Sequence, residues 1–227
     1  MIFDPVVTLS VGVQETDVST TISSLVGTDV TVDSTSGFSV GDLVILGQDV
    51  SSSPVMAVGE VVSIVGSVIT VDELVSNGSP VVDGTDDTLF RASGTSVSFG
   101  GLSNTLVTQR LIVWEVSVDV TNGFVVYLAE DADLQSGVNT ITDVSDGEVT
   151  AGSTEYGARS SDTTLAGSTF DSEDAPVTST LQQIGTVASG SASFDAKGYV
   201  ELKASRSGLA QQGTYEHDLY VVASPTY

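Results

Sequence analysis

Cysteine is absent from this chain of 227 residues, and histidine and tryptophan each occur once. Without cysteine there is neither a disulfide nor a thiolate-bound metal, so packing and hydrogen bonds must stabilise the fold. The single histidine excludes paired-histidine zinc sites, and no G-x-x-x-x-G-K-[ST] phosphate loop occurs. Zinc and nucleotide chemistry therefore have no support in the sequence, and we expect no cofactor.

Positive charge is scarce. Six Lys and Arg residues stand against 30 Asp and Glu residues, which gives a formal net charge of -24. Such a field repels phosphate backbones, so we exclude nucleic acid as a partner. Only 16% of the residues are charged and 40% are hydrophobic, which is typical of a folded chain with an acidic surface. Salt or divalent cations outside a cell would screen this charge, and an extracellular setting suits it.

Long apolar runs are also missing. No segment reaches the roughly 18 apolar residues of a membrane span, so we expect a protein that is not membrane-embedded. The start, Met1-Ile2-Phe3-Asp4-Pro5, lacks the basic and apolar regions of an export signal. Either the protein is not exported, or Met1 stands at a processed end; the sequence leaves both open.

Alternation of apolar and polar residues is the dominant pattern. In Ile112–Val120 the even positions are apolar, as expected for a half-buried strand. Asn122-Gly123 and a second apolar run, Phe124–Leu128, follow, and Asn-Gly between two such runs predicts a β-hairpin. Gly198–Arg206 and Thr214–Ala223 are further predicted strands. We predict an all-β protein, an antiparallel β-sandwich of the immunoglobulin-like or jelly-roll type.

The first third of the chain has shorter strands separated by glycine turns. They are predicted at Thr28–Asp33, Leu43–Leu46, Glu60–Val65 and Val68–Asp72, with a tight turn at Val65-Gly66-Ser67. The segments Val30–Leu46 and Gly59–Val75 resemble a small β-barrel module met in secreted and viral structural proteins. The resemblance implies a small β-barrel at residues 27–92, inserted into a sandwich formed by residues 1–26 and 93–227.

The segment Gly37-Phe38-Ser39-Val40-Gly41 fits the G-x-S-x-G pattern of hydrolase nucleophiles. A nucleophile elbow must lead from a strand into a helix, but Asp42–Leu46 continues as another apolar strand. We therefore place Ser39 in an ordinary loop and interpret His217 as a structural or surface residue. No catalytic residue is predicted, and we expect no enzyme activity.

Two acidic segments are candidates for calcium, because Ca²⁺ takes several oxygen ligands from flexible loops. The first contains Glu130, Asp131, Asp133, Asp143, Asp146 and Glu148, and the second contains Asp83, Asp86 and Asp87. Neither has EF-hand spacing, and aspartates in turns also bond nearby backbone amides. The alternative is a set of solvated acidic loops, and we assign no metal ligand. An internal amide from Lys197 or Lys203 to an Asn or Asp would suit a fibre protein, although no spacing favours it.

The N-terminal segment has a continuous apolar stripe. Its candidate assembly residues are Phe3, Val7, Leu9, Val11 and Val13, which share one face of an extended strand. Residues 1–13 are therefore a candidate donor strand that adds to the sheet edge of a second copy. The alternative is that this strand fills the sandwich of its own chain.

Three segments carry a family resemblance: "GTSVSFGGLS" (Gly94–Ser103), Val116–Ser161 with "VTAGSTEYG", and Gly198–Tyr227. They resemble secreted β-sandwich surface proteins of candidate-phyla (Patescibacteria-type) bacteria. The resemblance implies an extracellular, non-enzymatic structural protein, a self-assembling subunit of a cell-surface filament or pilus-like fibre. A carbohydrate- or partner-binding surface module and a virion or tail structural protein are the alternatives.

Overall fold

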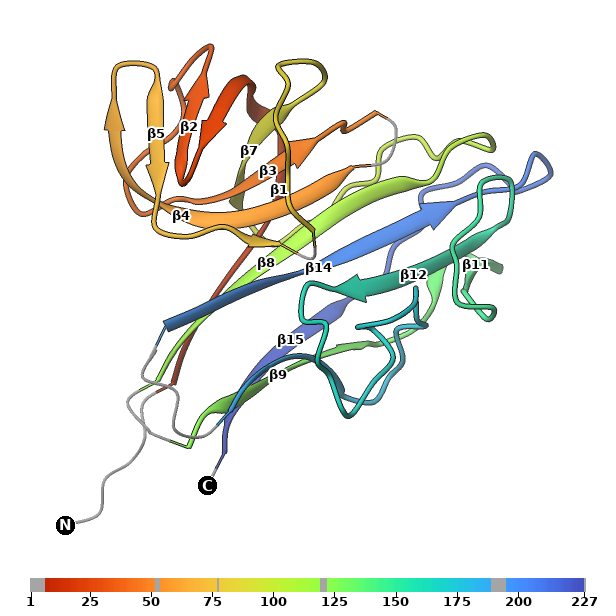
Figure 1. The fold of residues 1–227 in the computed structure, drawn as a ribbon. Helices are drawn as coiled ribbons and strands as arrows, with labels where there is room; N and C mark the ends of the chain where they lie inside the picture. Colours follow the sequence, from red (N-terminus) through yellow and green to blue (C-terminus); the bar gives the residue numbers. More distant parts are fainter. Residues whose placement is uncertain (1–6, 52–53, 77, 119–121, 189–194, 227) are drawn as a thin grey trace. The chain divides into compact units, whose positions relative to one another are not determined.

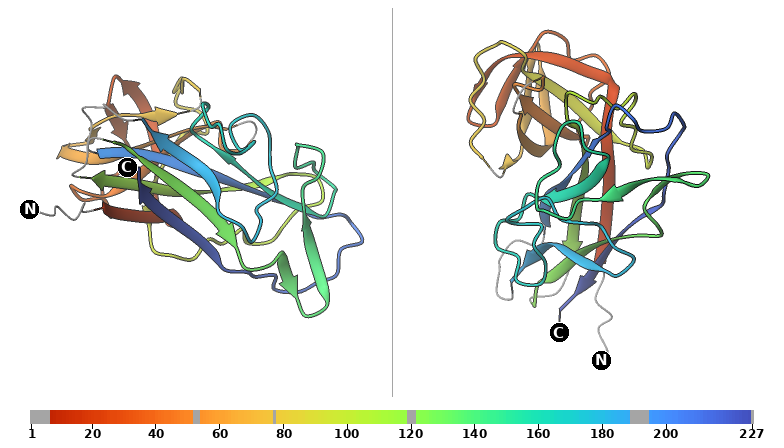
Figure 2. Two further views of the ribbon diagram at one scale, coloured as in Figure 1. Left: turned by 90° about the horizontal axis from the view of Figure 1, so that it is seen from below. Right: turned by 90° about the vertical axis from the view of Figure 1, so that its right-hand side faces the viewer.

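The computed structural model describes residues 7–51, 54–76, 78–118, 122–188 and 195–226. Within these ranges the chain forms fifteen β-strands joined by turns and loops, with no helix (Figures 1 and 2). No helix long and apolar enough to span a membrane occurs in this part of the chain. The predicted all-β class is confirmed.

The chain divides into two compact units, which are described separately. The first contains residues 1–10, 98–110 and 115–227, and the second contains residues 11–97 and 111–114. Two long strands, β1 (Val7–Val26) and β8 (Thr108–Val118), contribute residues to both units.

The first unit, here called the sandwich unit, contains two packed sheets (Figure 1). The larger sheet has the order β10 (Leu134–Ser136), β11 (Asn139–Asp143), β12 (Glu155–Ser160), β14 (Asp195–Ser205), β8 and β1. The smaller has the order β13 (Gln182–Val187), β9 (Phe124–Glu130) and β15 (Leu219–Pro225). The predicted β-sandwich is confirmed. β11 and β12 pair in parallel, whereas their other neighbours, β10 and β14, pair with them antiparallel.

Strand β9 lies at the centre of the smaller sheet, and its alternation explains the core. Phe124, Val126 and Leu128 are fully buried, whereas Val125 and Tyr127 between them are only partly buried. Because successive side chains of a strand point to opposite faces, these three share the inward face. Each such buried side chain contributes about 1.5–3 kcal/mol relative to an exposed one.

The hairpin predicted around Asn122-Gly123 is wrong. β8 and β9 flank this turn but belong to different sheets, so the chain passes here from one layer of the sandwich to the other. Gly123 has the positive φ of 81° that the turn requires, and an added Cβ would collide with the backbone oxygen of Val187. The local sequence correctly predicts a turn at Asn122-Gly123. It does not predict which strands pair with β9, and these are β13 and β15.

The second unit, here called the cyclic unit, contains strands that pair in a ring. The order is β1, β2 (Asp29–Val32), β5 (Val68–Val71), β4 (Val55–Val65), β3 (Leu43–Gln48) and β7 (Thr88–Ser93), and β7 pairs back onto β1. The short β6 (Val75–Ser76) adds to β4. This pairing does not establish the predicted barrel. The predicted insertion, residues 27–92, lies inside this unit, which also includes residues 11–26 and 93–97.

The predicted tight turn between β4 and β5 is present, with Val65 opposite Val68 and Gly66 at a φ of 62°. The core of the unit consists of apolar side chains: Ile22, Val30, Val32, Phe38, Val44, Leu46, Ala57, Val61, Ile69, Val71 and Leu89.

Candidate functional site

Ser39 lies in an exposed loop, as predicted. Its backbone N–H donates to the Asp42 carboxylate at 2.8 Å, and β3 begins directly afterwards at Leu43. The strand-to-helix geometry of a nucleophile elbow is therefore missing at this position.

His217 is buried in the sandwich unit, with 6% of its side chain exposed. Its Nδ1 lies 2.9 Å from the Ala132 carbonyl oxygen and 3.0 Å from Glu130 Oε2, and its ring meets the Tyr156 ring edge-on at 5.1 Å. Burial by itself lowers the pKa of His217, but the contacts with Glu130 and Ala132 and the nearby Asp131 raise it overall. His217 therefore faces an acidic cluster and favours its protonated form.

Three carboxylates of that cluster converge. Glu130 ends β9, Asp143 ends β11, and Asp133 lies in the turn before β10. One ligand oxygen from each of the three lies within 4.8 Å of the others. This group, here called the acidic cluster, contains three of the six acids that the sequence singled out around residues 130–148.

The cluster is electrostatically strained. Burial, followed by the charges of Glu130 and Asp133, raises the pKa of Asp143 from 3.8 to about 7, and His217 opposes this shift. Burial and the same carboxylates, Glu130 and Asp143, also raise the pKa of the Tyr156 hydroxyl. Like charges therefore crowd a partly dehydrated space.

Two buried oxygens at this position, Asp143 Oδ1 and the Tyr156 hydroxyl, have no hydrogen-bond partner among the described residues, whereas Glu130 Oε2 lies 3.0 Å from His217 Nδ1. Buried polar atoms normally find a partner, so oxygens without one mark a place for a missing donor, a water or an ion. Tyr156 was not predicted as a site residue. It lies within the "VTAGSTEYG" segment, but its sequence position alone does not relate it to Glu130.

A hard divalent cation fits this donor set. Calcium prefers carboxylate and other oxygen ligands at about 2.3–2.6 Å, so oxygens that share one ion lie up to about 5 Å apart. Glu130, Asp133 and Asp143 would hold such an ion, and its charge would relieve their mutual repulsion. No other group of metal-ligating side chains converges in this way in the ranges that the structure describes.

Five of the remaining predicted acids accept hydrogen bonds within the chain. Asp131 accepts a hydrogen bond from the backbone of Asp218, and Asp146 accepts one from Glu148. In the "DGTDD" segment, Asp87 accepts from the amides of Asp83 and Gly84. Further bonds in this loop run from Thr85 to Asp83 and from Ser51 to Asp86. Asp83, Asp87 and Asp146 thus bond nearby backbone amides, as aspartates in turns do, whereas Asp86 and Asp131 join segments that are far apart in the sequence.

The candidate assembly residues lie in β1, except Phe3, which is outside the described residues. Val7, Leu9 and Val11 are partly buried and Val13 is buried, whereas Thr8 and Ser10 between them are exposed. The predicted alternation is therefore present. β1 lies beside β8 in a sheet of its own chain, so this stripe already has a surface to pack on.

The two edges of the smaller sheet differ. The β13 edge is covered by side chains: Ser168 and Ser160 donate to the carbonyls of Gln183 and Ile184, and Thr186 N–H donates to Asp162. At the other edge, β15 pairs with β9 alone among the described strands. Its outer face exposes Tyr220 at 50% and Val222 at 39%.

Comparison of the chain with protein-family models, with curated proteins and with solved structures gave no match.

Proposed function

We propose that this chain is a non-enzymatic extracellular structural protein, a subunit that assembles with copies of itself into a cell-surface filament or pilus-like fibre. The observation that carries the proposal is the difference between the two edges of the smaller sheet. One edge is covered by side-chain hydrogen bonds, and the other presents a strand with two exposed apolar side chains. The resemblance to secreted surface proteins points in the same direction.

An uncovered edge strand is a template for β-strand addition, in which main-chain hydrogen bonds join two chains. Pairing of two β15 edges with each other would close a twofold dimer, so a filament requires a donor from a different surface of the neighbouring copy. A contact of that head-to-tail kind propagates into an open filament. In the proposal, the N-terminal segment with Phe3, Val7 and Leu9 donates to β15 of the next copy, and residues 7–13 leave their own sheet to do so.

The test is polymer formation by the full chain at an ionic strength of about 0.15 M, which screens the acidic surface. We expect regular fibres in negative-stain images and a fast-sedimenting fraction. The double variant Tyr220→Lys, Val222→Lys should remain monomeric, since lysine on an edge strand opposes pairing. Leu181→Lys is the matched control, because Leu181 is equally exposed but precedes the covered strand β13.

Phe3→Asp and Leu9→Asp test the donor segment. Both substitutions should prevent fibre formation. The variants must keep the β-sheet circular dichroism of wild type, which shows that they are still folded. A wild-type chain that stays monomeric at every concentration and salt level contradicts the proposal and favours a partner-binding module. Normal fibres from the β15 double variant place the joint elsewhere and contradict the proposed edge.

A further inference from the structure

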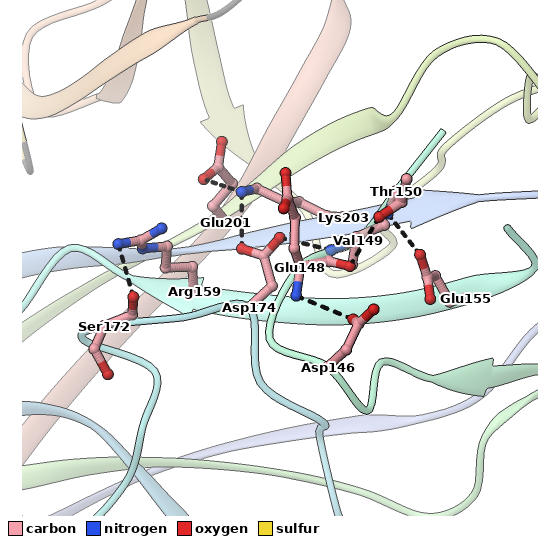
Figure 3. Close-up of polar contacts among 10 residues, drawn as sticks. All are labelled: Asp146, Glu148, Val149, Thr150, Glu155, Arg159, Ser172, Asp174, Glu201 and Lys203. Atoms are coloured by element: carbon pink, nitrogen blue, oxygen red, sulfur yellow. Dashed lines mark hydrogen bonds and ion pairs between the residues drawn. The ribbon is translucent and has the colours of Figure 1, made fainter. Parts of the chain in front are cut away.

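Three ionisable side chains of the sandwich unit meet away from the acidic cluster: Lys203, Glu201 and Asp174 (Figure 3). Lys203 and Glu201 are two residues apart on β14, so they share one face of the strand. Asp174 belongs to the segment between β12 and β13 and directly precedes Ala175, which bridges Ala158 of β12. Because β12 pairs with β14, this bridge brings Asp174 close to the lysine.

The three groups are close together and shielded from water. Lys203 Nζ lies 2.8 Å from Asp174 Oδ1 and 3.6 Å from Glu201 Oε2. The exposed fractions of the side chains are 14% for Lys203, 5% for Asp174 and 9% for Glu201.

Asp174 is held in place by two further hydrogen bonds. Its Oδ2 accepts the backbone N–H of Val149 at 3.0 Å (Figure 3). Its own N–H donates to the Gly147 carbonyl at 2.9 Å. The carboxyl group is therefore held in a fixed orientation with one oxygen in contact with the lysine nitrogen. Such fixation makes an intramolecular reaction fast relative to the same reaction between free molecules.

We propose that Lys203 and Asp174 condense into an intramolecular amide bond, with Glu201 as the catalytic residue that transfers the protons. The inference does not depend on the proposed filament, because all three groups belong to one chain. The bond would tie the segment that contains Asp174 to β14 covalently.

The reaction balances without an oxidant or a cofactor. The Lys203 ammonium gives a proton to the Asp174 carboxylate, and the resulting amine attacks the carbonyl carbon, which forms the C–N bond. Glu201 protonates the departing oxygen and accepts a proton from the nitrogen. Its protonation state is therefore the same after the reaction as before it. One C–O bond breaks, and one water leaves.

The environment suits these roles. Burial raises the pKa of Glu201, Asp174 adds to the shift, and Lys203 and Arg159 oppose it. Glu201 thus retains its proton more readily than a free glutamate and is able to act as a general acid. One ammonium faces two carboxyl groups, so protonated Glu201 leaves a charge-neutral set.

Lys197 is the matched comparison. It is also buried, with 4% of its side chain exposed, and its Nζ lies 3.0 Å from Glu115 Oε1. Lys197→Met therefore removes an equally buried lysine of the same strand without touching the three groups.

The test is the mass of the intact, denatured full chain. We expect wild type to be lighter than its sequence mass by one water, and a branched tryptic peptide to join the segments that contain Asp174 and Lys203. Lys203→Met and Asp174→Ala should show the full sequence mass, whereas Lys197→Met should keep the water loss. Asp174→Asn should lose ammonia in place of water. Glu201→Gln should slow formation of the bond after refolding by about 100-fold or more.

Two outcomes overturn the proposal. The first is a wild-type chain that keeps its full sequence mass after prolonged incubation in the folded state. The second is a water loss that persists in Lys203→Met, which identifies ring closure at an Asp-Gly pair such as Asp146-Gly147. The intact mass of wild type tests whether water is lost even where a variant does not fold.

Discussion

The two units of this chain have different interiors. The core of the cyclic unit is formed by aliphatic and aromatic side chains, whereas the sandwich unit buries Glu130, Asp174, Lys197 and Glu201. In the cyclic unit, Asp87 is the one buried ionisable residue among those described, and it accepts two backbone hydrogen bonds of its own loop. Buried charge is costly unless it is paired, so its placement is informative. The proposed amide bond and the acidic cluster therefore both belong to the sandwich unit, and we interpret the cyclic unit as a packing scaffold.

The largest expected effect is in the cyclic unit. Ile69→Ala removes a fully buried side chain from its core and should lower the free energy of unfolding by about 2–5 kcal/mol. Because no charge is involved, the loss should be the same at acidic and neutral pH. Urea denaturation followed by fluorescence at two pH values measures it.

Val65→Ala is the control for this variant, because Val65 is 74% exposed on the adjoining strand β4 and its truncation should change stability by less than about 0.5 kcal/mol. An Ile69→Ala effect that varies with pH would contradict the assignment of pH dependence to the sandwich unit.

The sequence predicted where strands occur better than it predicted which strands pair with each other. Alternation in Phe124–Leu128 identifies the face of β9 that is buried, but it does not specify whether β8 or β15 pairs with that strand. Prediction of the acidic cluster from the sequence is limited in the same way. Glu130 and Asp143 lie in a segment that the sequence marked as a calcium candidate. Tyr156 and His217 lie outside that segment in the sequence and come close to it only in the folded chain. The convergence of distant strands follows from tertiary packing, which the local pattern does not contain.

The second prediction concerns pH and the sandwich unit. The folded-state pKa of Asp143, about 7, lies above its ordinary value of 3.8, so the folded protein binds this proton more tightly than the unfolded chain. The resulting stability is complete below 3.8 and is lost as the pH rises toward 7. Since the side chain is half-buried, solvent screening reduces the effect to about 1–2 kcal/mol.

Unfolding free energies measured across this pH window with a chelator present test the prediction. Wild type should lose stability as the pH rises, and Asp143→Asn should show a smaller decline, because the raised pKa values of Glu201 and His217 act in the same direction. Glu148→Gln removes an exposed acid nearby and should keep the wild-type profile. Identical slopes for wild type and Asp143→Asn would show that another group is responsible.

The third prediction is a smaller effect of calcium on the same unit. At about pH 8, millimolar Ca²⁺ should stabilise wild type by about 1 kcal/mol, because an ion that binds only the folded state shifts the equilibrium toward it. Asp143→Asn should respond less. Thermal unfolding with Ca²⁺, with Mg²⁺ and with chelator at constant ionic strength measures this. Equal shifts in both proteins would indicate general screening of the acidic surface.

The smallest expected effect is that of Ser39→Ala in the cyclic unit. The bond that organises this loop runs from the Ser39 backbone N–H to the Asp42 carboxylate, so replacing the hydroxyl leaves it intact. The side chain is exposed, and stability should change by less than about 0.5 kcal/mol. Because β3 follows the loop directly, we expect no labelling of wild type by a serine-reactive fluorophosphonate and hence no difference in the variant. Labelling of wild type that disappears in Ser39→Ala would identify a nucleophile in the unit interpreted as scaffold, and it would reverse the distinction between the two units.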